Sequence, residues 1–313
     1  MNTQNTNVVE TEALSKRFGD KLVVDGVDLR IPRGSAFGYL GPNGAGKTTL
    51  IRMLLGLIEP SSGSMSLLGR PLPAERAAAL ARVGAIVDEP RFHGHMTGRQ
   101  NLSVLAAARE PESHGRIDGA LARVGLAERA DDRVSKYSMG MRQRLGIASC
   151  LLADPELLIL DEPMNGLDPA GMQEFRELIR SFVGEGRTVV LSSHLLDEVE
   201  RTCDAVAIVD RGRVVVQGSI DELAGDEHSL RLSTSDQSLS GMIAAADPAV
   251  VNVSDDSGRV VVALRPETSA QRAAAKISRS LIEAGVDLYE LEIEHASLEQ
   301  RFLEITSRLG VAA

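Results

Sequence analysis

The sequence predicts an α/β protein in which helices cover both faces of a parallel sheet, followed by a small domain of the α+β class. Three short apolar runs carry the first half of this prediction. Residues 36–40, 157–160 and 188–191 have the character of fully buried strands, and helical stretches separate them. Strands that alternate with helices indicate a parallel sheet. A chain of 313 residues is long enough for two domains.

The composition is that of an ordinary folded protein, with 43% hydrophobic and 25% charged residues. No apolar run approaches the ~18–20 residues that a membrane-spanning helix needs. Residues 1–8 lack the basic and apolar segments of a secretory signal. Cys150 and Cys203 are too few for a disulfide framework and lack metal-ligand spacing. We therefore expect two reduced thiols in the cytoplasm.

The charge of the chain argues against nucleic acid as a partner. The chain carries 34 basic and 44 acidic residues, a net charge of −10. Residues 220–313 hold 16 acidic and 8 basic residues, a net of −8, which leaves −2 for the rest. Proteins that bind nucleic acid usually present a basic surface.

The first domain is expected at residues 8–221 and contains an inserted helical subdomain at about 97–153. Alternating apolar residues predict early strands at 8–13 and 27–31. A buried strand at 36–40 follows, and after a glycine-rich turn comes a helix with Leu50, Met53, Leu54 and Leu57 at helical spacing. The subdomain is rich in Ala, Leu and Arg. Apolar strands at 157–160, 188–191 and 205–209 and a hairpin-like segment at 214–217 complete the unit.

The second domain is expected at residues 222–313, with an accessory or regulatory role. Its elements, in the order βαββαβ, predict a ferredoxin-like α+β fold. The predicted strands lie at 230–232, 250–253, 259–264 and 289–293, and the predicted helices at 239–246 and along Ala273, Ile277, Leu281 and Ala284. Tyr289, Leu291 and Ile293 are expected on the buried face of the last strand. Leu298, Phe302 and Ile305 predict a final amphipathic helix.

One glycine-rich loop predicts a phosphate-binding site. Gly41–Thr48 matches G-x-x-x-x-G-K-[ST] between a predicted strand and a predicted helix. Glycines let successive backbone N–H groups point into one concavity, and the helix adds its positive end. Lys47 is expected to reach the β- and γ-phosphates of ATP, and Thr48 to bind Mg²⁺. The full set of predicted nucleotide contacts here is Gly41, Pro42, Asn43, Gly44, Ala45, Gly46, Lys47, Thr48 and Thr49.

Two carboxylates follow the buried strand at 157–160. Asp161 is expected to bind the metal directly or through water, and Glu162 to orient and deprotonate the attacking water. Taken alone, the pair also fits an acidic turn after a core strand, but together with the glycine-rich loop it indicates hydrolysis of a nucleoside triphosphate.

Further segments resemble the ABC transporter ATP-binding cassette over about residues 8–221. Tyr137–Met141 resembles its signature motif, Asn165–Pro169 its D-loop and His194 its switch histidine, while Asp88 stands at the Q-loop glutamine position and Phe18 at that of the adenine-stacking aromatic. The resemblance implies a P-loop ATP-binding cassette fold with catalytic roles for Lys47, Glu162 and His194. It also implies nucleotide contacts by Phe18, Ser138, Gly140 and Asp168, and a metal site of Thr48, Asp161 and Asp88.

Three of these assignments have structural alternatives. Phe18 is equally consistent with a core aromatic, His194 with a core or capping histidine, and Ser138 with an ordinary helix N-cap. In the family, the signature serine faces ATP held by the opposite subunit, so that its N-cap position and its functional role coincide.

The departures from the family pattern point to one branch. Asp88 replaces Gln, and Met139 and Met141 replace Gly and Gln. Together with Asn165–Pro169 they resemble the bacitracin- and lantibiotic-resistance branch, whose membrane domain is a separate polypeptide. The resemblance implies an ATPase that drives export of an antibiotic, peptide or drug-like compound. Its implied partners are a multi-span transmembrane subunit and a second cassette, at the cytoplasmic face of the membrane.

Two other functions remain open from the sequence. A soluble ABC ATPase acting on ribosomes or nucleic acid usually has two fused cassettes or a coiled-coil insertion and a basic surface, and this sequence has none of these. A nucleotide-gated scaffold that does not hydrolyse ATP is supported only by Met139 and Asp88. Since Glu162 and His194 are both present, we expect hydrolysis.

Overall fold

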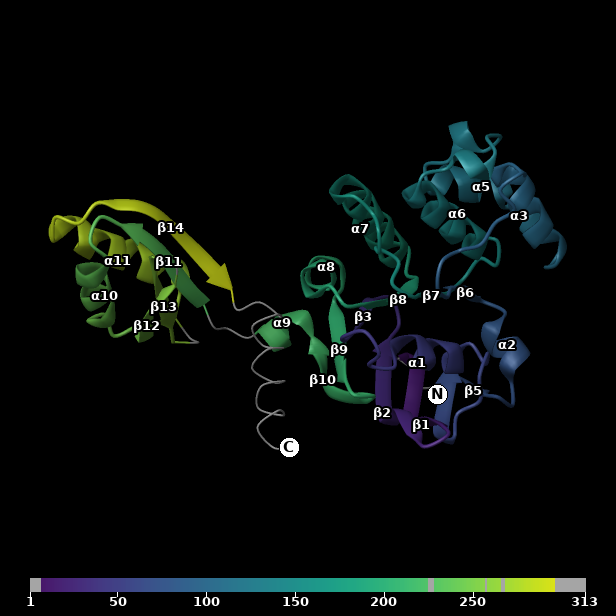
Figure 1. The fold of residues 1–313 in the computed structure, drawn as a ribbon, viewed down its shortest axis with the longest axis horizontal. Helices are drawn as coiled ribbons and strands as arrows, with labels where there is room; N and C mark the ends of the chain where they lie inside the picture. The colour runs from purple at the N-terminus through teal and green to yellow at the C-terminus, as the bar shows by residue number, and fades with distance from the viewer. Residues whose placement is uncertain (1–6, 225–227, 257, 266–267, 296–313) are drawn as a thin grey trace, which may run out of the picture. The chain divides into compact units, whose positions relative to one another are not determined.

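The computed structural model describes residues 7–224, 228–256, 258–265 and 268–295. The chain divides into two compact units, Met1–Gly218 and Ser219–Ala313 (Figure 1). In the described ranges, no helix is both long and apolar enough to cross a membrane.

A six-stranded sheet forms the centre of the first unit, in the order β10-β9-β3-β8-β7-β6. Neighbouring strands from β9 to β6 are parallel, which confirms the predicted α/β class. Every residue of β3, β7 and β8 is buried, as the continuous apolar runs predicted. The strand bounds are β3 Ala36–Leu40, β6 Val83–Ile86, β7 Leu157–Leu160, β8 Thr188–Ser193, β9 Ala205–Asp210 and β10 Arg213–Ser219.

The early strands build a second, antiparallel sheet in the order β2-β1-β4-β5. Its strands are β1 Asn7–Phe18, β2 Lys21–Pro32, β4 Ser62–Leu67 and β5 Arg70–Leu72. Helix α1 (Lys47–Leu54) shares its apolar core, where Leu50, Met53 and Leu54 are buried. Leu57 was expected on the same stripe, but the helix ends at Leu54 and Leu57 is 58% exposed. Gly56, with φ of 62°, turns the chain away at this point.

The inserted helical subdomain is present, and its helices α3, α5 and α6 lie together (Figure 1). Thr97 starts α3 with a capping box to Gln100. The helices of the unit beyond α1 are α2 Arg76–Leu80, α3 Gly98–Ala107, α4 Glu112–Gly115, α5 Ile117–Arg123, α6 Met139–Leu151, α7 Pro169–Gly184 and α8 Leu196–Thr202, with short 3₁₀ turns at Ala127–Arg129 and Val134–Lys136.

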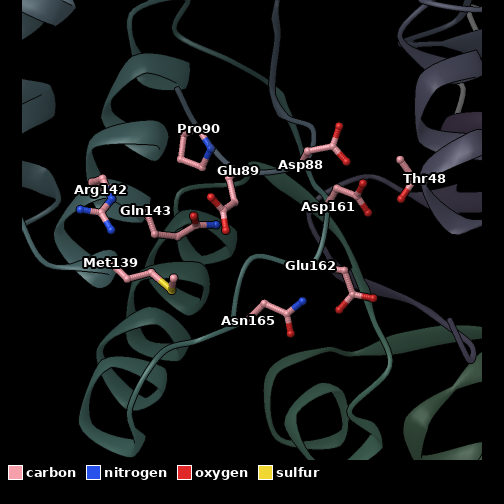
Figure 2. A pocket seen from close by; sticks show the side chains of 10 residues that line it. All are labelled: Thr48, Asp88, Glu89, Pro90, Met139, Arg142, Gln143, Asp161, Glu162 and Asn165. Carbon is pink, nitrogen blue, oxygen red and sulfur yellow. The ribbon is translucent and has the colours of Figure 1, made fainter. Parts of the chain in front are cut away.

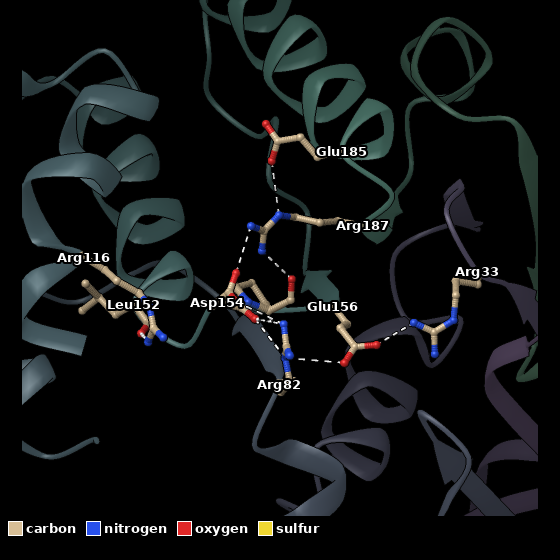
Figure 3. Close-up of polar contacts among 9 residues, drawn as sticks. Arg33, Arg82, Arg116, Leu152, Asp154, Glu156, Glu185 and Arg187 are labelled. Atoms are coloured by element: carbon tan, nitrogen blue, oxygen red, sulfur yellow. Dashed lines mark hydrogen bonds and ion pairs between the residues drawn. The ribbon is translucent and has the colours of Figure 1, made fainter. Parts of the chain in front are cut away.

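A charged network ties together the amino ends of the central strands (Figure 3). Arg82, before β6, forms an ion pair with Asp154 at 3.2 Å, and Asp154 also accepts from Arg187 at 3.0 Å. Glu156 bridges Arg82 at 3.5 Å and Arg33 at 2.5 Å. These contacts join the starts of three strands and the loop before β3, so they help to fix the register of the strands. They lie at the amino edge of the sheet, whereas the polar residues that follow the strands lie at its carboxyl edge.

The second unit contains the predicted βαββαβ order within its described residues. After α9 (Ile220–Ala224) come β11 His228–Thr234, α10 Gln237–Ala245, β12 Val250–Asp256, β13 Arg259–Leu264, α11 Ala270–Glu283 and β14 Leu288–His295. The sheet has the order β12-β13-β11-β14, with every neighbouring pair antiparallel. Its core includes Ala273, Ile277 and Leu281. Leu298, Phe302 and Ile305 of the predicted last helix lie outside the described residues.

The expected inward position of Tyr289 is wrong. Tyr289 is 69% exposed, whereas Leu288, Leu291 and Ile293 pack against the core. The register of β14 against β11 shifts between Ser233 and Thr234, which pair with Glu290 and Leu288. This bulge inserts one extra residue at 289, and it therefore reverses the alternation on which the prediction depended.

Candidate active site

The predicted phosphate-binding loop connects β3 to α1. Gly46 has a φ of 98°, and a Cβ atom there would lie 2.6 Å from the carbonyl oxygen of Val23. A Cβ atom at Gly41 would lie 2.4 Å from the carbonyl oxygen of Val209. Both positions therefore require glycine because neighbouring backbone leaves no room for a side chain. The loop is held tightly between β2 and β9, directly before the amino end of α1.

Lys47, the first residue of α1, is only 6% exposed. Its Nζ donates to the carbonyl oxygens of Gly41 at 2.6 Å and Pro42 at 3.2 Å, so the side chain folds back along its own loop. The same ammonium lies 3.1 Å from Oε1 of Glu162. The structure therefore brings together the two charged residues that the sequence predicted for phosphate binding and catalysis, which are far apart in the chain.

The acidic pair after β7 is anchored by a serine of the neighbouring strand. Ser192 of β8 is fully buried, and its Oγ donates to Oδ1 of Asp161 at 2.6 Å. The backbone N–H of Glu162 donates to the same Oγ at 2.9 Å. Glu162 has a φ of 46°, in the left-handed region that is strained for a residue with a side chain. Ser192 therefore holds both acidic residues in place at the carboxyl edge of the sheet.

His194, two residues beyond Ser192, completes this group. Its Nδ1 lies 2.9 Å from Oε2 of Glu162, and its side chain is 33% exposed. A side chain that is one-third exposed does not fit the alternative of a plain core histidine. Glu162 thus contacts Lys47 through one carboxylate oxygen and His194 through the other. Sequence reasoning missed Ser192, although the polar run Ser192-Ser193-His194 after an apolar strand is a signal that could have indicated it.

A cavity of about 290 Å³ lies beside these residues (Figure 2). It brings together all three residues predicted for the metal, since Thr48, Asp88 and Asp161 line it, as does Glu162. Asp88, with a φ of 58°, directs its Oδ2 to the guanidinium of Arg52 at 2.8 Å. The remaining lining residues are Glu89, Pro90, Met139, Arg142, Gln143 and Asn165.

A second cavity, of about 310 Å³, opens on the loop itself. Its lining joins the start of β2 to the loop and α1, and consists of Lys21, Val23, Asn43, Gly44, Gly46, Lys47, Thr48, Thr49 and Glu162. Of the other predicted loop contacts, Ala45 is buried. Phe18, at the tip of the β1–β2 hairpin, does not line this cavity, but its ring is 50% exposed, which excludes the core alternative. The Nζ of Lys16 lies 5.1 Å from the centroid of this ring.

The signature and D-loop residues line a separate cavity of about 340 Å³. Ser138 caps α6, since its Oγ accepts from the backbone of Met141 at 3.2 Å. Asp168 caps α7 in the same way, accepting from Gly171 at 2.8 Å. Gly140 lines the same cavity. The structure does not bring Ser138, Gly140 or Asp168 to the cavity on the phosphate-binding loop of the same chain.

The residues of the first cavity suit Mg²⁺. Within the described ranges, no group of three or more His, Cys, Asp and Glu side chains could hold a metal ion on protein ligands alone. Mg²⁺ in nucleotide sites is usually held by one or two protein oxygens together with phosphates and water. Thr48 and Asp161 supply one hydroxyl and one carboxylate to the same cavity. This donor set therefore fits a magnesium ion delivered with a nucleotide.

Comparisons with known proteins identify the family. The ABC transporter family model matches residues 24–165. The chain is 36% identical to an uncharacterized ABC transporter ATP-binding protein, YhcH of Bacillus subtilis, over 96% of both chains. It is 36% identical to the bacitracin transport ATP-binding protein BcrA of Bacillus licheniformis, over 96% of this chain and 97% of that protein. It is also 36% identical to the daunorubicin resistance ATP-binding protein DrrA3 of Streptomyces coeruleorubidus, over 95% of both.

Solved structures agree with this assignment. An ATP-binding subunit of an ABC transporter superposes with a TM-score of 0.62 at 30% identity, over 69% of this chain and 91% of that one. CbiO1 from Clostridium perfringens, part of an ABC transporter complex, gives a TM-score of 0.63 at 31% identity, over 68% and 89%. The chain therefore belongs to the ABC transporter ATP-binding proteins, ATPases in which an ATP-binding cassette couples hydrolysis to transport.

Proposed function

We propose that this protein is the ATP-hydrolysing subunit of an exporter and drives a separate multi-span transmembrane subunit that moves an antibiotic, a peptide or another drug-like compound. The names of two relatives, in bacitracin transport and daunorubicin resistance, support the substrate class. The chain would then act at the cytoplasmic face of the membrane, attached through that partner.

The observation that carries the proposal is the chain of contacts from Lys47 through Glu162 to His194. Lys47 and the loop N–H groups bind the β- and γ-phosphates. Glu162 then orients the attacking water and accepts its proton, while His194 holds the second carboxylate oxygen and lies on the γ-phosphate side. When ATP binds, Lys47 exchanges its carbonyl contacts for phosphate oxygens. This exchange leaves Glu162 next to the reacting phosphate.

Thr48 and Asp161 would hold the magnesium ion, and Ser192 orients the Asp161 carboxylate toward it. The ion would neutralise charge that develops on the phosphate oxygens. Asp88 lines the same cavity, but its carboxylate already accepts from Arg52, so the magnesium site proposed here consists of Thr48 and Asp161.

A second copy of the cassette is part of the proposal. Ser138, Gly140 and Asp168 line their own cavity, away from the phosphate-binding loop of the same chain. A helix N-terminus such as that of α6 attracts phosphate. These residues are therefore available to bind ATP held by another cassette, so that ATP joins two copies. Residues 222–313 are proposed as an accessory domain of each copy.

Replacing Glu162 by Gln tests the chemistry. The amide keeps the size of the side chain but cannot accept the proton, so hydrolysis is expected to fall by about 100-fold or more while ATP binding is retained. Glu177→Gln is the matched control, because Glu177 is exposed on α7 and contacts only Gln173 in the described part of the chain. Full activity in Glu162→Gln would contradict the assigned role.

Purification of the tagged protein from its native membrane in mild detergent tests the partner. The proposal expects a multi-span protein in a two-to-two complex, with ATPase activity that rises in the complex. Recovery of ribosomes or nucleic acid without a membrane protein would refute the exporter assignment and leave the ATPase assignment intact.

A further inference from the structure

An exposed ion pair joins the phosphate-binding helix to the segment that follows β6. Arg52 lies in the last turn of α1, and its Nη2 donates to Oδ2 of Asp88 at 2.8 Å. The two residues are 36 positions apart in the chain. Their side chains are 43% and 63% exposed. In Figure 2, Asp88 stands next to Thr48 and Asp161 at the same cavity.

The Arg52–Asp88 ion pair is relevant to ligand binding because acidic side chains predominate in the lining of this cavity. Four carboxylates line it, those of Asp88, Glu89, Asp161 and Glu162, against one guanidinium, that of Arg142. The nucleoside triphosphate that we propose to deliver the magnesium ion to this cavity is itself strongly negative. Glu162 already has the Lys47 ammonium 3.1 Å away. An unpaired carboxylate at position 88 would repel the phosphates, since like charges a few ångströms apart at a protein surface interact by about 1 to 4 kcal/mol.

We propose that Arg52 is the counter-ion that allows an acidic residue to stand at position 88 beside the phosphates. Arg52 is thus a positioning residue that acts through Asp88. It neutralises the carboxylate and holds it in one orientation on the cavity rim. The inference rests on the proposed function, because it takes ATP as the ligand of the cavity.

The pair has little importance for folding. Exposed ion pairs contribute about 0–1 kcal/mol to stability, so that removing one partner leaves the fold intact. Asp88 has a φ of 58°, in the left-handed region that aspartate adopts more readily than most residues. The effect of Arg52 is therefore expected in ligand affinity.

A double-mutant cycle in the Glu162→Gln background tests the inference, with the affinity for Mg²⁺-ATP measured by titration calorimetry. Arg52→Gln is expected to weaken binding by about three- to tenfold, because it leaves the Asp88 charge uncompensated. Asp88→Asn alone is expected to bind as tightly as the parent or up to about threefold more tightly. The double variant is expected to return to within about twofold of the parent. The Arg52→Gln effect is expected to shrink as salt rises, since both side chains are exposed.

Arg70→Gln is the matched control. Arg70 and Glu75 form an exposed pair at 3.0 Å in the same unit, with 50% and 49% exposure, and neither residue lines the cavity. This variant is expected to bind ATP like the parent. Thermal unfolding of each variant checks the fold.

Two results would overturn the inference alone. The first is equal affinity for ATP in the Arg52→Gln variant and in its parent, when the parent itself binds ATP. The other is a double variant as weak as Arg52→Gln, because Arg52 would then contact the phosphates directly and not act through Asp88. A parent that binds no ATP would instead refute the proposed function and this inference with it.

Discussion

Ser192→Ala is the substitution that the geometry of the site predicts most sharply. The Ser192 hydroxyl is fully buried and makes two hydrogen bonds, donating to Asp161 and accepting from the backbone of Glu162. A hydrogen bond to a charged group contributes about 1.5–3 kcal/mol, and a buried N–H left without a partner costs about 1–3 kcal/mol. The free energy of unfolding of the first unit is therefore expected to fall by the sum of these two contributions, about 2.5–6 kcal/mol.

Activity should fall with stability. Asp161 and Glu162 lose the group that orients them, and a misplacement of about 1 Å at a reacting centre can lower the rate by about 100-fold. We therefore expect kcat for ATP hydrolysis to fall by about 10- to 100-fold. Urea unfolding followed by circular dichroism measures the first effect. Steady-state ATPase assays at saturating Mg²⁺ measure the second.

Ser149→Ala is the control for the loss of a serine hydroxyl. Ser149 lies on α6, donates to the carbonyl oxygen of Gly146 at 2.6 Å, and lines none of the three cavities described above. If Ser192→Ala is no less stable than Ser149→Ala and keeps wild-type kcat, then Ser192 is an ordinary core residue. The reasoning that ties both acidic residues to Ser192 would then be wrong.

Three further predictions follow from the packing and the ionisable groups. Gly38→Ala should lower stability to urea by about 1–3 kcal/mol, since the new Cβ would lie 2.3 Å from Cγ1 of Val199, and Val199→Ala should recover part of the loss. Burial raises the pKa of the Cys150 thiol to about 12. At pH 8 a thiol reagent should therefore not label Cys150 before the protein unfolds. Rapid labelling of Cys150 in the native protein would contradict this expectation. The backbone N–H of Ala249 lowers the pKa of the Asp247 carboxyl, so stability of the second unit, measured by thermal unfolding, should be lost as pH falls below about 4. Asp247→Asn should flatten that pH dependence, and an unchanged profile would assign it to other carboxylates.

The sequence alone determined the order of the elements and predicted the chemistry of the site. A phosphate-binding loop is built from consecutive residues, so Gly41–Thr48 could be recognised without knowledge of the rest of the fold. In the same way, a fully apolar strand such as Leu157–Leu160 indicates a buried parallel strand, and the carboxylates at its end must then lie at an edge of the sheet. These predictions depended on local sequence patterns, and the structure bears out the strands and the loop.

Contacts between distant segments were decided only by the tertiary structure. Ser192 reaches Asp161 because β8 pairs with β7 in a parallel register, and Arg52 reaches Asp88 because β6 ends near the last turn of α1. The outward position of Tyr289 depends on a bulge against β11. A linear pattern contains neither strand order nor register, since both are set by the packing of segments that are far apart in the chain. The sequence therefore predicted which groups carry the chemistry, whereas the fold determined which side chains contact them.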